Sequence, residues 1–421
     1  MQVFKFGGAS VNSIERIRNL AEILRASPGD QKLIVISAMG KTTNALEKVV
    51  DAFYHQQMNE AQKLFQAIRE EHLHIAQQLI RGYAQTEKKL IDFFTEVEWL
   101  LHDQPKREYD YYYDQMVCVG ELLSTGIVSD YLNENGVSNL WFDVRDVFRT
   151  DDNYRDANID WSFTQSRINE LIVPQFREHG CMLTQGFIGS TAENESTTLG
   201  REGSDYSAAV FANLLSAESQ TIWKDVSGVM NADPKEFPDA QLIADLNYDE
   251  VIEMAYYGAQ VIHPKTIKPL QNKSIPLYVK CFLDPKLPGT IIHNGDIRGL
   301  PAIIVRKRNQ VLMHLHSKDF SFVGERPTGE LYHIFAELNI KPNLMQSGAV
   351  TLQVCLDDRS DKIEKLALKA SEFFDVHAEK GLVLLTIRHH DPKTVEGLSR
   401  GKKIVLRQES PETVQLLMRE N

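Results

Sequence analysis

The strongest constraint on the fold is the order of elements at the start of the chain. Residues 3–6 and 32–37 are short apolar runs typical of buried strands, and residues 13–25 between them carry apolar side chains at helical spacing. Two strands joined by a helix form a βαβ unit, because parallel strands need a long crossover connection. The sequence therefore predicts an α/β fold built on a parallel sheet.

The same alternation continues along the first 290 residues. Residues 45–119 are mostly helical, and this segment is long enough for an insertion that shapes a substrate pocket or a lid. We expect its tyrosine cluster at 109–113 to serve packing or an interface. Further strands are predicted at 140–144, 181–186, 220–223 and 275–280, and a further helix at 204–215.

The composition changes at residues 285–301, where glycine and proline gather in a predicted linker. An α+β pattern follows the linker, and a chain of 421 residues suits two or three domains. Strands are predicted at 311–315, 341–345, 351–356, 382–387 and 402–406, and helices at 331–338, 361–374 and 412–419.

Charge and cysteine content exclude several classes of protein. The net charge of -12 disfavours nucleic acid or an anionic membrane as the main partner. Four scattered cysteines without CxxC spacing argue against a disulfide scaffold or a zinc site. We see no signal peptide and no transmembrane run, so the sequence predicts a cytoplasmic protein.

Two adjacent glycines follow the first predicted strand, in the segment KFGGAS at residues 5–10. The backbone at Gly7 and Gly8 can approach a ligand closely, and successive amides there can bind an anion. Lys5 adds a positive charge for phosphate oxygens. A tight turn with a lysine at the surface is the alternative, and this motif alone leaves both open.

Polar side chains also follow the second predicted strand, in SAMGKTTN at residues 37–44. Ligands of open α/β sheets gather at the carboxyl ends of strands, so these hydroxyls can position a small acid. A helix cap by Thr42 or Thr43 would explain one of them without a ligand.

Glu121 lies in an apolar helical stretch at residues 116–132. A carboxylate in such a place needs a partner, because a buried unpaired charge is costly. It can bind the ammonium group of a ligand, or it can form a structural ion pair.

The most specific motif is TTLGREGSDYS at residues 197–207, which follows a predicted strand and opens a helix. Its glycines, hydroxyls and helix N-terminus suit phosphate. Arg201 can hold a carboxylate through two parallel hydrogen bonds.

Two charged turns complete the set. In the first, Asp225 can border a nucleotide while Lys224 and Lys235 face its phosphates, although a loop of solvated charges is the alternative. In the second, His263 is expected to cap a helix or lie in the core. No GxxxxGK[ST] loop and no protein-kinase signature occurs, so a kinase of this sequence belongs to neither class.

Together these motifs resemble the aspartate kinase family. KFGGAS, ISAMGKTTN, GELLS, FDVRDVFRT, TTLGREGSDYSAA, IWKDVSGV and GAQVIHP occur in that family's order and at its spacing. The resemblance implies an amino acid kinase fold over residues 1–290, a mainly parallel sheet between helical layers. An α+β ACT-like regulatory region over residues 300–421 would follow, with an incomplete second module and pairing that favours a homodimer.

The resemblance also implies a reaction and a role for each site residue. ATP with Mg²⁺ would phosphorylate the β-carboxylate of L-aspartate, the first step of lysine, threonine and methionine biosynthesis. That carboxylate is already ionised at neutral pH, so no general base is needed. Lys5 and Asp205 would be catalytic. Ser37, Thr43, Glu121 (on the ammonium group), Arg201 (on the α-carboxylate) and Ser204 would bind substrate. Lys5, Gly7, Gly8, Lys224, Asp225, Met230, Lys235 and Gln260 would bind the nucleotide, and no protein metal site is expected.

This chain departs from the family pattern around the nucleotide and in the regulatory region. Glu202 stands where glycine is usual, and Lys224 stands where threonine is usual. Asn343 and Ala349 replace acidic residues common in lysine-sensitive members, so we expect weak or absent inhibition by lysine. The alternative functions are another amino acid kinase, or an inactive kinase-like sensor of amino acids.

Overall fold

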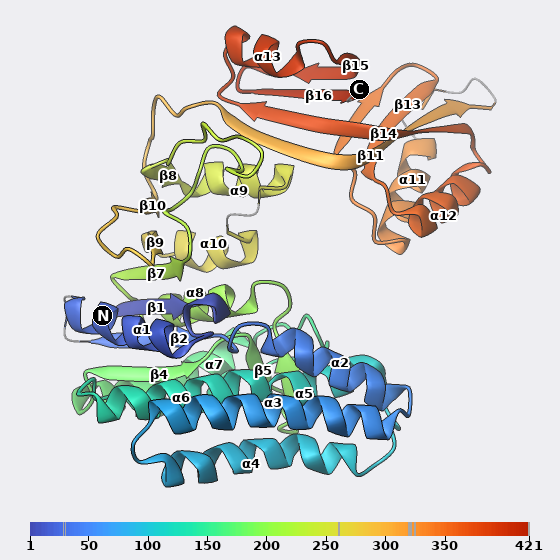
Figure 1. The fold of residues 1–421 in the computed structure, drawn as a ribbon. Coiled ribbons are helices and arrows are strands. Elements are labelled where there is room, and N and C mark those ends of the chain that lie inside the picture. Colours follow the sequence, from blue (N-terminus) through green and yellow to red (C-terminus); the bar gives the residue numbers. More distant parts are fainter. Residues whose placement is uncertain (28, 30, 260–261, 319–321, 324–325, 420–421) are drawn as a thin grey trace. The chain divides into compact units, whose positions relative to one another are not determined.

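The computed structural model describes residues 1–421 except 28, 30, 260–261, 319–321, 324–325 and 420–421. The chain divides into two compact units, which are coloured along the sequence in Figure 1. The first comprises Met1–Val229, Leu242–Ile252 and Val261–Ile297, and the second comprises Met230–Gln241, Glu253–Gln260 and Arg298–Asn421. The predicted domains 1–290 and 300–421 remain a prediction.

The first unit is built on an eight-stranded sheet in the order β3-β4-β2-β1-β7-β9-β10-β8. β1 pairs in parallel with both β2 and β7, and only β9 and β10 pair antiparallel among its described strands. The predicted α/β class is thus confirmed. The strands are β1 (Gln2–Phe6), β2 (Lys32–Ile36), β3 (Leu140–Trp141), β4 (Cys181–Gln185), β7 (Ser219–Lys224), β8 (Asp245–Asn247), β9 (Leu277–Cys281) and β10 (Thr290–His293), and β5 (Ile188–Ser190) pairs with β6 (Ser196–Thr198) apart from this sheet.

Helices cover this sheet, and Figure 1 shows α3, α4 and α6 lying together below β4. α6 has no distinct polar face and is buried along most of its length, because it lies between the sheet and other helices. The helices are α1 (Ile14–Ala26), α2 (Thr42–Tyr54), α3 (Met58–Leu79), α4 (Tyr83–Leu101), α5 (Tyr109–Val117), α6 (Val119–Glu134), α7 (Trp161–Arg167), α8 (Gly203–Leu214), α9 (Tyr248–Tyr257) and α10 (Pro264–Gln271), with shorter turns η1 (Gly8–Ser10), η2 (Val144–Asp146), η3 (Ile168–Ile172) and η4 (Val173–Arg177).

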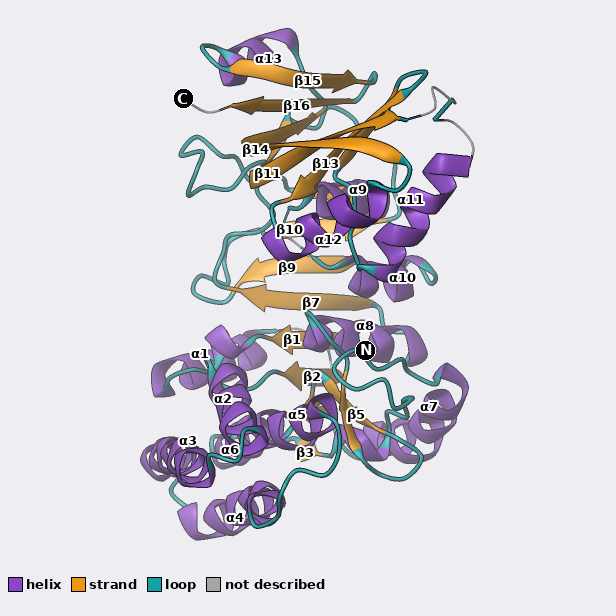
Figure 2. Ribbon diagram, turned by 90° about the vertical axis from the view of Figure 1, so that its right-hand side faces the viewer, coloured by secondary structure: helices purple, strands orange, loops and turns teal. Residues whose placement is uncertain are grey.

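The second unit contains a six-stranded antiparallel sheet in the order β12-β13-β11-β14-β16-β15. Helices α11 and α12 pack on it through one apolar cluster, and they lie beside it in Figure 2. The elements are β11 (Ile303–Ser317), α11 (Arg326–Glu337), β12 (Leu344–Ser347), β13 (Thr351–Asp357), α12 (Ser360–Ala370), β14 (Phe374–Arg388), α13 (Pro392–Ser399), β15 (Lys403–Glu409) and β16 (Thr413–Arg419).

Two predictions of secondary structure are wrong. The predicted helix at 412–419 is strand β16, which lies between β14 and β15 with both faces buried. Val414, Leu417 and Met418 fit helical spacing, whereas Val414, Leu416 and Met418 alternate as in a strand, so the periodicity of this short segment could not decide. The predicted linker at 285–301 contains β10, which pairs with β8 and β9.

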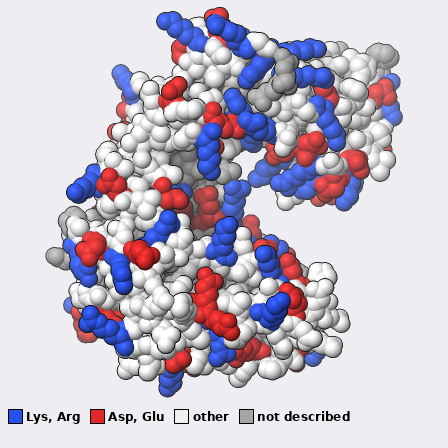
Figure 3. All heavy atoms as spheres, in the orientation of Figure 1, with Lys and Arg blue, Asp and Glu red and all other residues white. Residues whose placement is uncertain are grey.

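Surface charge is mixed in both units. Figure 3 shows basic and acidic side chains interspersed over the face in view. None of the helices in the described part of the chain combines the length with the apolar composition that spanning a bilayer requires.

Candidate active site

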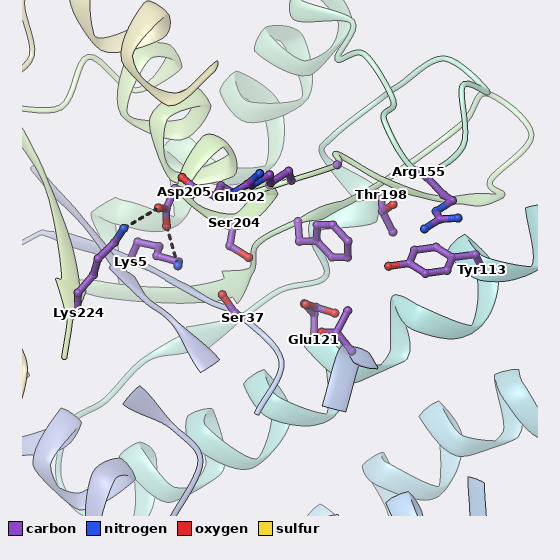
Figure 4. A pocket seen from close by; sticks show the side chains of 15 residues that line it. Lys5, Ser37, Tyr113, Glu121, Arg155, Thr198, Glu202, Ser204, Asp205 and Lys224 are labelled. Atoms are coloured by element: carbon purple, nitrogen blue, oxygen red, sulfur yellow. Dashed lines mark ion pairs between the residues drawn. The ribbon is translucent and has the colours of Figure 1, made fainter. Parts of the chain in front are cut away.

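A cavity of about 490 Å³ lies in the first unit (Figure 4). It forms at the carboxyl ends of β1, β2 and β7 and at the N-terminus of α8, where ligands of open α/β sheets gather. Its lining residues are Lys5, Ser37, Thr43, Tyr113, Glu121, Arg155, Phe187, Thr198, Gly200, Arg201, Glu202, Gly203, Ser204, Asp205 and Lys224.

One end of the cavity carries a cluster of three charges, of which Lys5 and Asp205 are buried and Lys224 is half-buried. Lys5 Nζ lies 2.6 Å from Asp205 Oδ1, and Lys224 Nζ lies 3.9 Å from Asp205 Oδ2. Burial raises the pKa of Asp205, but the ammonium groups of Lys5 and Lys224 outweigh it and keep that pKa below its ordinary value. With Asp205 ionised, this end holds one net positive charge and suits an anion.

The glycine turn after β1 serves packing. A Cβ atom on Gly8 would lie 2.5 Å from the carbonyl oxygen of Ala38, and Gly40 N donates a hydrogen bond to Gly8 O at 3.0 Å. Gly7 and Gly8 are not among the residues that line the cavity, so their contact with phosphates stays a prediction. Lys5 itself is buried, which excludes the alternative of a lysine at the surface.

Glu121 has no cationic partner within the described chain. Its Oε1 accepts a hydrogen bond from Ala38 N at 3.2 Å, and its Oε2 is buried without a partner among the described residues. Burial raises the pKa of Glu121 to about 8, although the Ala38 amide and Lys5 oppose the rise. The alternative of a structural ion pair is therefore wrong, and the carboxyl group is left to receive a ligand.

Hydroxyl groups line the middle of the cavity. Helix α2 begins without a side-chain cap, and the Thr42 hydroxyl donates to Met39 O at 2.7 Å instead. Capping therefore does not account for Thr43, which lines the cavity with Ser37 and Ser204. Gly186 allows the start of α8 to approach, because a Cβ atom there would lie 2.6 Å from Ser204 Cβ.

Glu202 adopts a backbone conformation that favours glycine. Its φ of 55° lies in the left-handed region, which non-glycine residues adopt at a cost. Its Oε2 accepts a hydrogen bond from His263 N at 2.9 Å, at the start of α10. Thus the carboxylate is bound to a helix N-terminus, where negative charge is favoured. His263 caps α10 through Nδ1, which accepts from Lys265 N at 3.2 Å, as expected.

Several predicted nucleotide residues are not brought to the cavity. Asp225 is exposed and does not line it. Met230 and Lys235 belong to the second unit, and Gln260 lies outside the described residues. The roles of these four residues stay predictions.

Sequence reasoning missed the opposite end of the cavity. The guanidinium of Arg155 lies over the Tyr113 ring, 4.3 Å from its centroid, whereas the tyrosine cluster was expected to serve packing. Buried Asp114 accepts hydrogen bonds from Arg155 N at 3.0 Å and from Thr198 N and Oγ1, each at 2.7 Å. Burial raises the pKa of Asp114 to about 7 despite these bonds. Phe187 completes this wall.

Comparisons with known proteins agree with this geometry. Residues 1–281 match the amino acid kinase family. Lysine-sensitive aspartokinase 3 of Escherichia coli K12 is 31% identical over 408 residues, which cover 94% of this chain and 89% of that protein. The chloroplastic aspartokinase 2 of Arabidopsis thaliana is 31% identical over 84% of this chain and 66% of its own length.

A solved structure supports the same relationship. The crystal structure of E. coli aspartokinase III in complex with aspartate and ADP (R-state) matches with a TM-score of 0.84 at 29% identity, over 100% of this chain and 96% of that one. The chain therefore belongs to the amino acid kinase family and, within it, to the aspartokinases.

Proposed function

We propose that this protein is an aspartate kinase, which transfers the γ-phosphoryl group of ATP to the β-carboxylate of L-aspartate and gives 4-phospho-L-aspartate. One observation carries the proposal: a single cavity holds a lysine pair at one end and an unpaired buried carboxyl group, Glu121, towards the other. These two features complement a polyphosphate and an amino group. The ligands of E. coli aspartokinase III, aspartate and ADP, support the same pairing.

Each residue then has a task that follows from its chemistry. Glu121 accepts hydrogen bonds from the substrate ammonium group, and Arg201 holds the α-carboxylate. The β-carboxylate is the nucleophile and needs no general base, so catalysis is positioning together with charge neutralisation. Lys5 supplies that neutralisation, while Asp205 fixes the position of the Lys5 ammonium group. The hydroxyl groups of Ser37, Thr43 and Ser204 orient the reacting carboxylate.

The residues present also suit ATP with Mg²⁺. The described residues contain no group of three or more His, Cys, Asp or Glu side chains that could hold a metal ion. Mg²⁺ is commonly bound through substrate phosphates with few protein ligands, so a dedicated protein cage is not required. When bound, the ion would neutralise part of the charge on the phosphates beside Lys5 and Lys224.

The departures from the family pattern are compatible with activity. Lys224 adds an ammonium group at the phosphate end of the cavity. The Glu202 carboxylate accepts a hydrogen bond from the His263 amide. Neither observation favours the alternative of an inactive sensor.

The proposal is tested by trapping the acyl phosphate with hydroxylamine. Purified protein with ATP, Mg²⁺ and L-aspartate should yield aspartyl hydroxamate, whereas glutamate and N-acetylglutamate should not react. Glu121→Gln is the matched negative control, since it keeps the size of the side chain but cannot ionise to bind the ammonium group. Tight ATP binding without hydroxamate would instead establish a sensor.

The second unit is proposed to regulate the first as an ACT-like region and to pair two copies into a homodimer. We further propose that the enzyme acts in the cytoplasm, in lysine biosynthesis. Asn343 supports weak inhibition by lysine, because its amide group is already engaged by Lys307, Gln310 and Asp357 at 2.7, 2.8 and 2.9 Å.

A further inference from the structure

A second guanidinium group lines the cavity besides that of Arg201. Arg155 lies in the loop that precedes α7, and Figure 4 shows it beside Tyr113, across the cavity from Lys5 and Lys224. An arginine that stacks on an aromatic face keeps its N–H donors at the edge of the guanidinium plane. The donors that are not already paired with Asp110 and Glu47 remain available to a planar anion such as a carboxylate.

The backbone of Arg155 is strained, and a buried charge holds it in place. Its φ of 69° lies in the left-handed region, which is unfavourable for a side chain of this kind. The strained conformation is fixed by the hydrogen bond from Arg155 N to Asp114. Asp114 also fixes Thr198, so one buried carboxylate orders two residues of the same cavity wall. Strain of this type gathers at functional sites.

A purely structural role for Arg155 accounts poorly for that strain. The guanidinium forms ion pairs with Asp110 at 3.2 Å and with Glu47 at 3.4 Å, both longer than a strong charge-assisted hydrogen bond. The three side chains are between 38% and 56% exposed, and such pairs contribute little to stability. These contacts offer no compensation for a strained backbone and a buried carboxylate.

The charged groups of an amino acid substrate explain why the Arg155 guanidinium lines the cavity. An α-carbon carries an ammonium group and a carboxylate side by side. Glu121 is suited to the ammonium group, and the reacting β-carboxylate must extend towards Lys5. The α-carboxylate is then left on the side of the cavity that Arg155 occupies (Figure 4). Resting on the proposed function, we propose that Arg155 binds the α-carboxylate of the substrate together with Arg201, and that it selects against amino acids whose α-carboxylate is blocked.

Arg155→Gly is the informative variant, because glycine adopts a φ of 69° without strain. The variant should keep or raise the free energy of unfolding. Its KM for L-aspartate should rise about 10- to 100-fold, as expected for the loss of hydrogen bonds between charged groups, while kcat changes little. The inhibition constant of L-aspartate α-methyl ester, which keeps the ammonium group and the β-carboxylate, should stay the same.

Arg107→Ala is the matched control. Arg107 also stacks on a tyrosine, 3.6 Å from the Tyr111 centroid, and pairs with Glu195, but it does not line the cavity. Its removal should leave both constants unchanged. If the KM for aspartate and the inhibition constant of the ester rise together in Arg155→Gly, or if neither changes, the inference is wrong. A wild-type protein that forms no hydroxamate would contradict the proposed function itself.

Discussion

Aspartate binding should release nearly one proton at neutral pH. Glu121 must be ionised to bind the ammonium group, yet burial raises its pKa to about 8. In about nine tenths of the free enzyme molecules the Glu121 carboxyl group is therefore protonated at pH 7. Ionising it there costs about 1.4 kcal/mol, or about tenfold in affinity. Between pH 6 and pH 8 the ionised fraction rises from about 1% to about half, so aspartate affinity should rise about fifty-fold.

The same pKa has the opposite consequence for stability. A carboxyl group whose pKa is raised on folding contributes stability that is complete below its ordinary pKa of 4.5 and is lost as the pH rises through about 8. At pH 7, about 2.5 pH units above the ordinary value, the loss is about 3 kcal/mol. Glu121→Gln removes this loss, so the variant should resist denaturant better than the wild type while it binds aspartate poorly.

Isothermal titration calorimetry measures the proton directly, through the dependence of the binding enthalpy on the ionisation enthalpy of the buffer. At pH 7 the wild type should release about 0.9 proton per aspartate bound, and Glu121→Gln close to none. Thr43→Val is the matched control, because Thr43 lines the same cavity without titrating. It should weaken binding and leave the proton release intact. Equal release by the wild type and Glu121→Gln would refute the reasoning.

Three further predictions follow from other contacts. Lys5→Met should abolish phosphoryl transfer and lower the free energy of unfolding by about 3 kcal/mol, because Asp205 stays buried with Lys224 at 3.9 Å in place of the close Lys5 ammonium group. The double variant Lys5→Met/Asp205→Asn should recover much of the stability in urea but no activity. Glu202→Gly removes both the left-handed backbone strain and the hydrogen bond from His263, so the two effects should offset and the free energy of unfolding should change by less than about 1 kcal/mol. The KM for ATP should stay similar, and a large gain in ATP affinity would mean that the Glu202 carboxylate opposes nucleotide binding. Titration with lysine should inhibit the enzyme weakly or not at all, since the Asn343 amide already donates a hydrogen bond to Asp357, and strong inhibition at micromolar lysine would contradict this.

Local patterns were sufficient for most of the fold. The spacing within residues 1–37 predicted a βαβ unit, and β1 and β2 do pair in parallel, with Gln2 opposite Lys32. Glu121 lies in a mostly apolar helical stretch and was expected to be buried, as it is in α6. The error at β16 had a different origin. Its six buried positions come from neighbours on both edges and packing on both faces, which the segment itself does not encode.

The cavity was only half predictable for the same reason. The sequence motifs predicted binding or catalytic roles for Lys5, Glu121 and Asp205, and all three side chains line one cavity in the structure. Arg155 sits in no motif, and its orientation depends on a carboxylate 41 residues earlier in the chain. Glu202 departs from the family pattern, and the group that donates a hydrogen bond to its carboxylate, His263 N, lies 61 residues away in the chain. A single sequence read locally cannot supply such pairings.

The neutral state of Glu121 also determines how selective the site can be. A dicarboxylic acid without an ammonium group, such as succinate, can bind while Glu121 stays protonated, so its affinity gains nothing from ionisation of that residue. Aspartate needs the ionised form, and each pH unit below about 8 weakens its binding about tenfold. Competition of succinate against aspartate should therefore be strongest at low pH and should weaken as the pH rises to 8. In Glu121→Gln the preference for aspartate should be lost at every pH. A competition ratio that is independent of pH in the wild type would mean that another group binds the ammonium ion.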